Sequence, residues 1–486
     1  MLETKNEPLF INATHALANN EMTLSTGVSI FDIDGDGESE ILVANNNSGN
    51  NIYKYNENTF EFEDISPNEF KLKKKQTLGF SIGDFFGKGI PCIYTLNSFN
   101  KSSRNKNEDD LFLFQEKVID EKKYMTFKNL FSKNSHFDFV NSSGSQNVCA
   151  VDYEGEGIHG FLVLHANEFP SFYSSEKLSE EKSFSRDSSK ERGLSISKHG
   201  KIAISQMILS KNASDILILE NKNQIKLFTR GDKNNYIHLN SNIDLDGILT
   251  NLLSICVADF TGNGLADIVI ISQEGNKILF HETPGEFYDV TPLVIQQLKH
   301  IRSAVVADFD NDGREEIFFT CARGSNVMFR YLGSNEWESV DIGELKLSQY
   351  SSTGCAYGDL TGSGRLDLFV ASGEFQIQEN QLFLGQSNGN YWLRVQPLTQ
   401  FKFPALSAKV TILFNDNTLQ TKFICSGSGY HSQMEPIAHF GFGLEKPKIK
   451  SLEVVWPGKK EQIFRTVIHG DHIPLNSCLQ ISFPFA

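Results

Sequence analysis

The chain has 486 residues, a hydrophobic content of 40% and a formal net charge of −15. This length gives room for a large core in more than one domain, and the negative charge opposes contact with a phosphate backbone, so nucleic acid is a poor candidate partner. The sequence contains no run of 18 apolar residues, so no transmembrane segment is expected. Residues 1–7 are polar and lack the apolar stretch of a signal peptide, so no cleaved export signal is expected within this chain.

An acidic loop between two short apolar runs is the first distinctive element. Residues 27–31 and 41–44 are β-prone, and between them a carboxylate stands at every second position from Asp32 to Glu40. A calcium ion takes roughly six to eight oxygen ligands, which an alternating acidic loop supplies. An EF-hand is excluded, because the closing acid stands at the ninth position of the loop and Val43 occupies the twelfth. The element is therefore predicted to be a β-hairpin whose turn holds calcium.

The same hairpin recurs along the chain. Its first aspartate reappears at Asp84, Asp152, Asp259, Asp308 and Asp359. The widest gap between these aspartates holds a decayed copy, in which aligning Asp215 with Asp267 puts Met207 in place of the first aspartate. Each period spans about 50 residues and ends in two further β-prone segments. The sequence therefore predicts an all-β fold that contains a seven-bladed β-propeller with four strands in each blade.

The last period stops before its fourth strand. Residues 8–14 resemble the segments that end the other blades, so the N-terminus is expected to complete the seventh blade and close the ring. Polar insertions at residues 97–110 and 174–192 interrupt blades two and three. Both are expected on the face opposite the acidic loops, where they would form a partner-binding surface.

Two loops have a strong calcium-binding pattern, and two others have a weaker one. The strong loops carry acids at positions 1, 3, 5 and 9, and their candidate metal ligands, with the seventh residues included, are Asp32, Asp34, Asp36, Glu38, Glu40, Asp308, Asp310, Asp312, Arg314 and Glu316. The weaker loops combine two carboxylates with neutral oxygens, and their candidate ligands are Asp259, Thr261, Asn263, Asp267, Asp359, Thr361, Ser363 and Asp367. The loops at Asp84 and Asp152 are predicted to be metal-free, with the charge of Lys88 replacing an ion in the former. For every loop the alternative is a solvated turn without an ion.

These loops resemble FG-GAP (VCBS-type) repeats, the calcium-bearing propeller repeats shared with integrin α-subunits. Farther along, residues 407–411, 426–433, 439–443 and 454–457 resemble, in this order, the ASPIC/UnbV domain. A propeller followed by this domain resembles the cartilage acidic protein 1 family and its bacterial homologues. The resemblance implies an integrin-α-like propeller over residues 1–388 and a small β-sandwich-like ASPIC/UnbV domain over residues 389–486. It also implies export, because the family usually carries a secretion signal.

The cysteines and two histidines are expected to be structural. Cys149, Cys256 and Cys355 each fall in an innermost strand shortly before the loop, where a small buried thiol fits, so no disulfide framework is predicted and a reducing compartment is favoured. His431 and His439 have no acid or cysteine at metal-ligand spacing and are expected to be turn or core residues.

No catalytic motif is found in the sequence. It contains no CxxC pair, no nucleophile elbow and no phosphate loop, and a calcium ion closed in by protein oxygens offers no activated water. The leading hypothesis is a non-enzymatic, calcium-stabilised propeller that binds a protein or glycan partner. Two alternatives stay open at this point: an enzyme with its active site in the axial funnel of the propeller, and an assembly or maturation factor for a larger complex.

Overall fold

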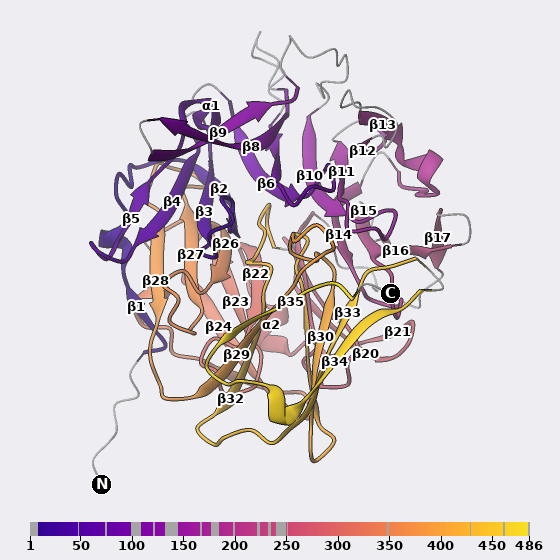
Figure 1. The fold of residues 1–486 in the computed structure, drawn as a ribbon. Coiled ribbons are helices and arrows are strands. Elements are labelled where there is room, and N and C mark those ends of the chain that lie inside the picture. Colours follow the sequence, from indigo (N-terminus) through magenta and orange to yellow (C-terminus); the bar gives the residue numbers. More distant parts are fainter. Residues whose placement is uncertain are drawn as a thin grey trace.

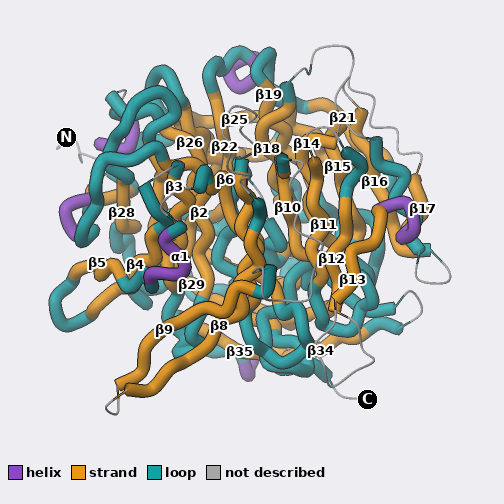
Figure 2. The backbone as a smooth tube through the Cα atoms, turned by 90° about the horizontal axis from the view of Figure 1, so that it is seen from above, coloured by secondary structure: helices purple, strands orange, loops and turns teal. Residues whose placement is uncertain are grey.

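Seven antiparallel sheets of four strands each surround a common axis in the described part of the chain (Figure 1). Figure 2 shows the innermost strands side by side around this axis. The computed structural model describes residues 8–46, 48–72, 75–98, 108–119, 122–131, 144–165, 168–175, 184–197, 200–220, 224–231, 235–239, 249, 251–347, 349–427, 429–459 and 462–484.

Each of the first six blades consists of four consecutive strands, and the seventh takes its outermost strand from the N-terminus. The innermost strands are β2 (Ser25–Phe31), β6 (Thr77–Gly83), β10 (Ser145–Val151), β14 (Gly200–Gln206), β18 (Leu252–Ala258), β22 (Ile301–Ala307) and β26 (Ser352–Gly358). The second strands are β3 (Glu40–Asn45), β7 (Cys92–Asn97), β11 (Gly160–His165), β15 (Asp215–Glu220), β19 (Asp267–Ser272), β23 (Glu316–Cys321) and β27 (Asp367–Ser372). The third strands are β4 (Asn51–Asn56), β8 (Asp110–Ile119), β12 (Ser171–Ser175), β16 (Gln224–Arg230), β20 (Lys277–Thr283), β24 (Val327–Gly333) and β28 (Gln381–Gly385). The outermost strands are β5 (Glu61–Asp64), β9 (Lys122–Asn129), β13 (Phe184–Ser188), β17 (Tyr236–Leu239), β21 (Glu286–Asp289), β25 (Glu336–Ser339) and β1 (Phe10–Asn12).

The ring closes as predicted. Neighbouring innermost strands contact one another around the whole ring, including β26 with β2. Strand β1 pairs antiparallel with β28, with Phe10 opposite Gly385, and covers the edge that the last blade would otherwise expose. These contacts confirm the seven-bladed propeller and the role of the N-terminal segment.

The repeated sequence builds the same local geometry in every blade. Each innermost strand begins with a β-bulge against its second strand, and a bulge increases the twist of the sheet. The decayed blade keeps this register, because Gln206 pairs with Asp215 as Ala258 pairs with Asp267. Met207 therefore occupies the position of a first loop aspartate, as the sequence alignment predicted.

Residues 174–192 of blade three do not lie where the sequence predicted them. The predicted position was the connection between the second and third strands. In the structure a short link joins β11 to β12, and residues 174–192 begin at the end of β12. Residues 176–183, between β12 and β13, lie outside the described residues. The described parts of the run are the end of β12, the fourth strand β13 and the turn η2, so the run does not lie between the second and third strands. In blade two, residues 97–110 do join β7 to β8 as predicted, and residues 99–107 lie outside the described residues.

The C-terminal part forms two further sheets. One has the order β32-β29-β35, with β29 and β35 parallel, and the other has the order β31-β30-β33-β34. Their strands are β29 (Tyr391–Pro397), β30 (Lys409–Phe414), β31 (Leu419–Phe423), β32 (Ala438–Gly443), β33 (Ile449–Trp456), β34 (Phe464–His469) and β35 (Cys478–Ile481). The short helical turns are α1 (Asn68–Lys71), α2 (Leu293–Gln296), η1 (Thr14–Ala16), η2 (Ser189–Arg192), η4 (Gly343–Lys346) and η5 (Gly470–His472). Among the described residues, none of these helices is long and apolar enough to cross a membrane.

The C-terminal sheets lie against the face of the ring that carries the acidic loops (Figure 1). Gly443 N–H donates to the Asn311 carbonyl at 2.7 Å, and Gly458 N–H donates to the Asn212 carbonyl at 2.7 Å. The approach is close at Gly364, where an added Cβ would lie 1.9 Å from the Trp392 ring. The apolar core is continuous across this contact, since Phe31 and Phe85 of the propeller cluster with Phe403.

A loop of the C-terminal part enters the axis of the ring. We call residues 425–437 the axial loop, of which 425–427 and 429–437 are described. Ile30 N–H donates to the Gln433 carbonyl and Gln433 N–H donates to the Val28 carbonyl, both at 3.0 Å. Further hydrogen bonds join the loop to the innermost strands of blades two, four, five and six, through Ile82, Ser205, Ile255 and Ser303. The axial loop therefore occupies the centre of the propeller.

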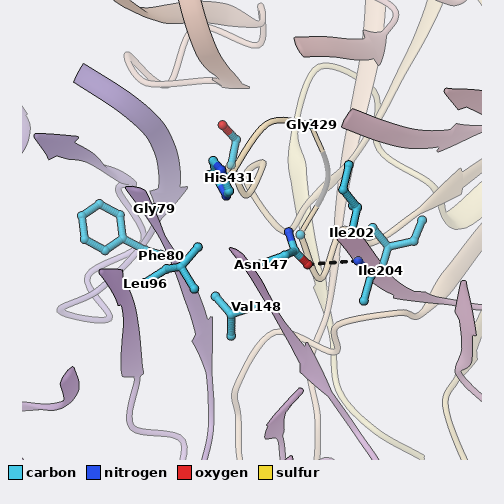
Figure 3. A pocket seen from close by; sticks show the side chains of 12 residues that line it. Gly79, Phe80, Leu96, Asn147, Val148, Ile202, Ile204, Gly429 and His431 are labelled. Carbon is cyan, nitrogen blue, oxygen red and sulfur yellow. Dashed lines mark hydrogen bonds between the residues drawn. The ribbon is translucent and has the colours of Figure 1, made fainter. Parts of the chain in front are cut away.

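The space left beside the axial loop is small. One cavity of about 10 Å³ lies between His431 and the innermost strands of blades two, three and four (Figure 3). Two others, beside Cys425 and beside His439, measure about 40 Å³ each. Such volumes hold single water molecules. The axial funnel, where the enzyme alternative placed its active site, is thus filled by the chain itself in the described structure.

Candidate metal loops of the propeller

The first aspartate of each loop closes the turn with its own carboxylate. Asp32 Oδ1 accepts a hydrogen bond from Asp36 N–H at 3.2 Å, and Oδ2 accepts one from Gly37 N–H at 2.9 Å. The other five first aspartates accept the same two N–H groups. Blade four lacks this aspartate, and there Asp215 Oδ2 accepts the N–H groups of residues 208–210. The first aspartate thus shapes the turn in all six loops, including those predicted to be metal-free.

In blade one, three carboxylates converge and a lysine lies among them. Oxygens of Asp32, Asp34 and Asp36 all lie within 4.8 Å of one another. Lys54 Nζ, from the third strand β4, lies 2.8 Å from Asp34, 2.6 Å from Asp36 and 2.9 Å from Glu40. Glu40 is completely buried, and its Oε1 ion-pairs with Lys54 but accepts no hydrogen bond from the described residues. The Lys54 ammonium is therefore the group that faces this buried carboxylate oxygen, at 2.9 Å.

Blade six repeats this arrangement with an arginine. Oxygens of Asp308, Asp310 and Glu316 lie within 4.8 Å of one another. Arg330, on β24, donates through Nε to Glu316 Oε1 at 2.6 Å and also pairs with Asp310. Its NH1 lies 3.6 Å from Asp312 Oδ2. In blade six the structure thus groups the acids of positions 1, 3 and 9, and Arg330 contacts those of positions 3, 5 and 9.

Burial makes the negative charge of both loops costly. It raises the pKa of Glu40 to about 8, with Asp34 adding to the shift and Lys54 opposing it. It raises the pKa of Asp308 to about 8 against the opposing charge of Lys422, and the pKa of Glu316 well above its usual range. For Lys54 burial favours the neutral amine, but Glu40 and the loop acids outweigh it and raise the pKa. These carboxylates are fully ionised at neutral pH only with additional positive charge nearby.

The loop oxygens fit calcium. In each strong loop one oxygen of the ninth acid accepts the N–H of the second residue, from Ile33 at 2.7 Å and from Phe309 at 2.9 Å. This bond turns the remaining oxygen toward the carboxylates of positions 3 and 5, and hard carboxylate oxygens are the ligands that calcium prefers. Glu40 Oε1 already faces a cation in this position, the Lys54 ammonium at 2.9 Å. The side chains of Glu38 and Arg314, at position 7, make no such approach in the described structure and could contribute only a backbone carbonyl.

The weaker loops of blades five and seven are satisfied by the protein's own donors. Asp267 accepts N–H groups of Phe260 and His281, and Asp367 accepts those of Leu360 and Gly385. The amide of Asn263 is engaged with backbone groups, and Ser363 Oγ donates weakly to Asp359 at 3.4 Å. No contact of the Thr261 or Thr361 hydroxyl helps to build either loop in the described residues. Calcium sites in these loops stay predictions.

The C-terminal part supplies cations to three of the loops in the described residues. Lys459 Nζ lies 3.0 Å from Glu156 in the loop of blade three. Arg394 NH1 lies 3.2 Å from Asp359 Oδ2, and the same guanidinium pairs with Glu435 of the axial loop. Lys422 pairs with Glu315, next to the ninth acid of blade six. Burial raises the pKa of Asp359, and Arg394 opposes that shift. A calcium ion at Asp359 would therefore have to compete with a buried guanidinium.

The lysine predicted to replace an ion does not do so. In the described part of the chain no ion pair joins Lys88 to Asp84. Lys88 contributes its backbone N–H, which donates to that carboxylate at 3.0 Å, as Gly89 N–H also does at 2.7 Å. The cations that the propeller itself places against its two most acidic loops lie on third strands instead, and each stands 14 residues after the ninth acid, Lys54 after Glu40 and Arg330 after Glu316. This shared spacing is the signal in the sequence that could have identified them.

The predicted structural role of the histidines and cysteines is confirmed. His431 and His439 are largely buried, and burial lowers the pKa of His431 to about 4. His439 Nε2 shares a hydrogen bond of 2.5 Å with Asn311 Oδ1. All seven cysteines are free, and Cys149, Cys256 and Cys355 are buried.

Family models and curated relatives agree with this architecture. The model of the ASPIC and UnbV family matches residues 399–477, and the model of the FG-GAP-like repeat matches residues 259–319 and 308–370. Cartilage acidic protein 1 of Xenopus tropicalis is 31% identical over 518 residues, which cover 99% of this chain and 78% of that protein. The human cartilage acidic protein 1 is 30% identical, over 98% of this chain and 76% of that protein. Among solved structures, BBS1N in complex with ARL6DN matches with a TM-score of 0.45 and 10% identity, over 79% of this chain and 98% of that chain.

Proposed function

This chain belongs to the cartilage acidic protein 1 family, and we propose that it is a non-catalytic scaffold, stabilised by calcium, that binds a protein or glycan partner. The observation that carries the proposal is the pair of acidic clusters in matching loops of blades one and six. Bound there, calcium supplies two positive charges to carboxylates whose ionisation burial opposes. The residues that would hold it are Asp32, Asp34, Asp36 and Glu40 in blade one, and Asp308, Asp310, Asp312 and Glu316 in blade six.

The filled axis favours a scaffold over an enzyme. Propellers that act on small molecules need an open funnel, whereas here the axial loop hydrogen-bonds to innermost strands around the ring. The remaining cavities of about 10 and 40 Å³ beside it hold water but no substrate.

A partner would use the surfaces that the C-terminal sheets leave free. The C-terminal part contacts the loops of blades two to seven, so the opposite face and the rim stay open. Residues 97–110 of blade two lead to that opposite face, which keeps the proposed binding surface on blade two; blade three no longer contributes to it. Replacing residues 97–110 with a short Gly/Ser turn should abolish partner capture and leave calcium binding intact.

Co-purification from native extract, with calcium or with EDTA, tests the proposed function. A stable protein or glycan partner that is retained in calcium supports the scaffold. Turnover of a small molecule, or a partner bound equally by the variant without residues 97–110, contradicts it.

A further inference from the structure

Lys54 stands where a metal ion would stand in the loop of blade one. Its ammonium lies within 2.9 Å of three carboxylates, those of Asp34, Asp36 and Glu40. These are the third, fifth and ninth residues of the loop, the positions that an alternating acidic loop offers to calcium. The lysine reaches them from β4, which pairs with β3 so that Tyr53 faces Ile41, and Lys54 comes next to Glu40.

Arg330 occupies the same register in blade six. Strands β23 and β24 pair with Glu316 opposite Arg330, and the guanidinium contacts Glu316 and Asp310 while lying 3.6 Å from Asp312. The same three loop positions are therefore in contact with one basic side chain in both acid-rich blades. Recurrence at the same register in two separate blades, with blade seven between them, argues against a chance surface ion pair.

The blades with fewer acids lack this cation. Leu279 pairs with Ile268 in blade five and Phe383 pairs with Leu368 in blade seven, so Phe280 and Leu384 are the residues that come next to the ninth acids, Asp267 and Asp367. In these blades the ninth acid accepts a hydrogen bond from a backbone N–H of the third strand. His281 N–H donates to Asp267 at 2.7 Å, and Gly385 N–H donates to Asp367 at 2.9 Å. A neutral donor is sufficient where two acids meet, and a full charge is present where four meet.

We propose that Lys54 and Arg330 are built-in cations that compete with calcium for the two acidic loops and thereby set its affinity. The proposal rests on the proposed calcium binding, because it concerns the same carboxylates. Without calcium, the basic side chain neutralises part of the loop charge and keeps the hairpin folded. When calcium binds, the side chain is displaced, so part of the calcium binding energy is spent on breaking ion pairs.

The two cations differ in how easily they leave. The Lys54 side chain is 19% exposed, and an ammonium on a flexible stem can turn toward water. Arg330 is 17% exposed and binds through a planar fork that gives stronger, directed bonds to carboxylates. Blade one is therefore expected to exchange its lysine for calcium at lower calcium concentrations than blade six exchanges its arginine.

Calcium titration of the full chain by isothermal calorimetry tests the competition. Lys54→Met should tighten the site of blade one by roughly tenfold or more, because a unit charge at ion-pair distance is removed. Arg330→Met should act in the same direction on blade six. Lys277→Met, which removes an ion pair to Asp289 in blade five, is the matched control and should leave calcium affinity unchanged.

Amine labelling of the wild-type chain gives a test that does not depend on a variant's folding. Mass spectrometry after brief acetylation should find Lys54 protected in EDTA and more reactive in calcium, with Lys277 labelled equally in both. Calcium binding without a rise in Lys54 reactivity, or an affinity that Lys54→Met leaves equal or weaker, overturns the competition and leaves calcium binding standing. If neither the wild type nor the variants bind calcium, the proposed calcium binding itself is wrong. Binding by Lys54→Met alone supports the competition in its strongest form.

Discussion

The loops of blades one and six share sequence and hydrogen bonding but have opposite surroundings. Around Gly35 and Gly37 of blade one an added Cβ would meet open space, and the Asp36 side chain is 47% exposed. In blade six Asp308 is 1% exposed, and an added Cβ on Gly441 would lie 2.2 Å from its carboxylate. The repeat therefore determines the turn, and the C-terminal sheets determine how much water the turn meets.

The covered loop is held by the C-terminal part through its backbone. Asn390 donates to the Asp310 carbonyl at 2.8 Å, Gly443 N–H to the Asn311 carbonyl at 2.7 Å, and Gln420 to the Gly313 carbonyl at 3.3 Å. In the described residues, the corresponding loop of blade one makes one hydrogen bond to the C-terminal part. It joins two side chains, with Ser39 Oγ donating to Glu435. The loop of blade six is thus bound by the C-terminal part, whereas the loop of blade one is open to solvent.

The largest expected effect comes from forcing the C-terminal sheet off the loop of blade six. Gly441→Ala places a Cβ against Asn311 and Asp308, so unfolding free energy should fall by about 3 kcal/mol or more, by overpacking of a rigid contact. Gly275→Ala is the control, because its Cβ would meet its nearest neighbour at an ordinary 3.4 Å. Urea unfolding measures both. Equal effects of the two variants would contradict the tight contact.

Calcium should stabilise the ring through both loops. At a hundredfold excess over Kd one site contributes about 2.7 kcal/mol, or roughly 3 °C in melting temperature for a chain of this size. Asp34→Asn and Asp310→Asn should each remove about one such increment of the difference between calcium and EDTA. Glu154→Gln, at the third position of the loop in blade three, should remove none. Melting curves that are the same in calcium and EDTA for all four proteins would reject the calcium sites.

In EDTA the ring should lose stability as the pH rises. The pKa values of Glu40 and Asp308 are raised to about 8 in the folded state, above those of free carboxyl groups, so their contribution is fully present near pH 4 and is lost as the pH approaches 8. Since one pKa unit corresponds to about 1.4 kcal/mol and both values are raised by several units, the loss should be at least about 2 kcal/mol. Saturating calcium should flatten the profile, because it favours the ionised carboxylates. Parallel pH profiles in calcium and EDTA would show that these groups do not hold the ion.

The smallest effect is expected at the seventh loop position. Glu38→Gln and Arg314→Ala should change melting by less than about 1 °C in calcium or in EDTA, because only the backbone carbonyl of this residue could reach an ion. A marked loss of calcium affinity in Glu38→Gln would instead give its carboxylate a direct role.

Local sequence patterns predicted the structural features that lie within a single blade. The acidic turn, the flanking strands and the position of Met207 follow from residues within one period, and so does the N-terminal strand that replaces a missing one. The short strand β12 was not predicted, because its serines lie next to a charged run and hide the β pattern; this moved the insertion of blade three to the wrong connection.

Contacts between residues far apart in the sequence could not be predicted from local sequence patterns. Gln433 pairs with Val28, and Arg394 reaches Asp359, across separations that no repeat period encodes. The axial loop also breaks the pattern of a strand, since its contacts are individual hydrogen bonds to many blades. Lys54 and Arg330 could have been found, because their shared distance from the ninth acid is visible once the blades are aligned, but a single basic residue on a strand has no motif of its own.

A crystal structure of the full chain grown in calcium, with anomalous scattering data, tests the central claim most directly. We predict an anomalous peak among Asp32, Asp34, Asp36 and Glu40 and a second among Asp308, Asp310, Asp312 and Glu316, with Lys54 turned away from the first. Loops without a peak, with Lys54 and Arg330 still seated among the carboxylates at millimolar calcium, would show that the ring neutralises these acids itself and would contradict a calcium-stabilised propeller.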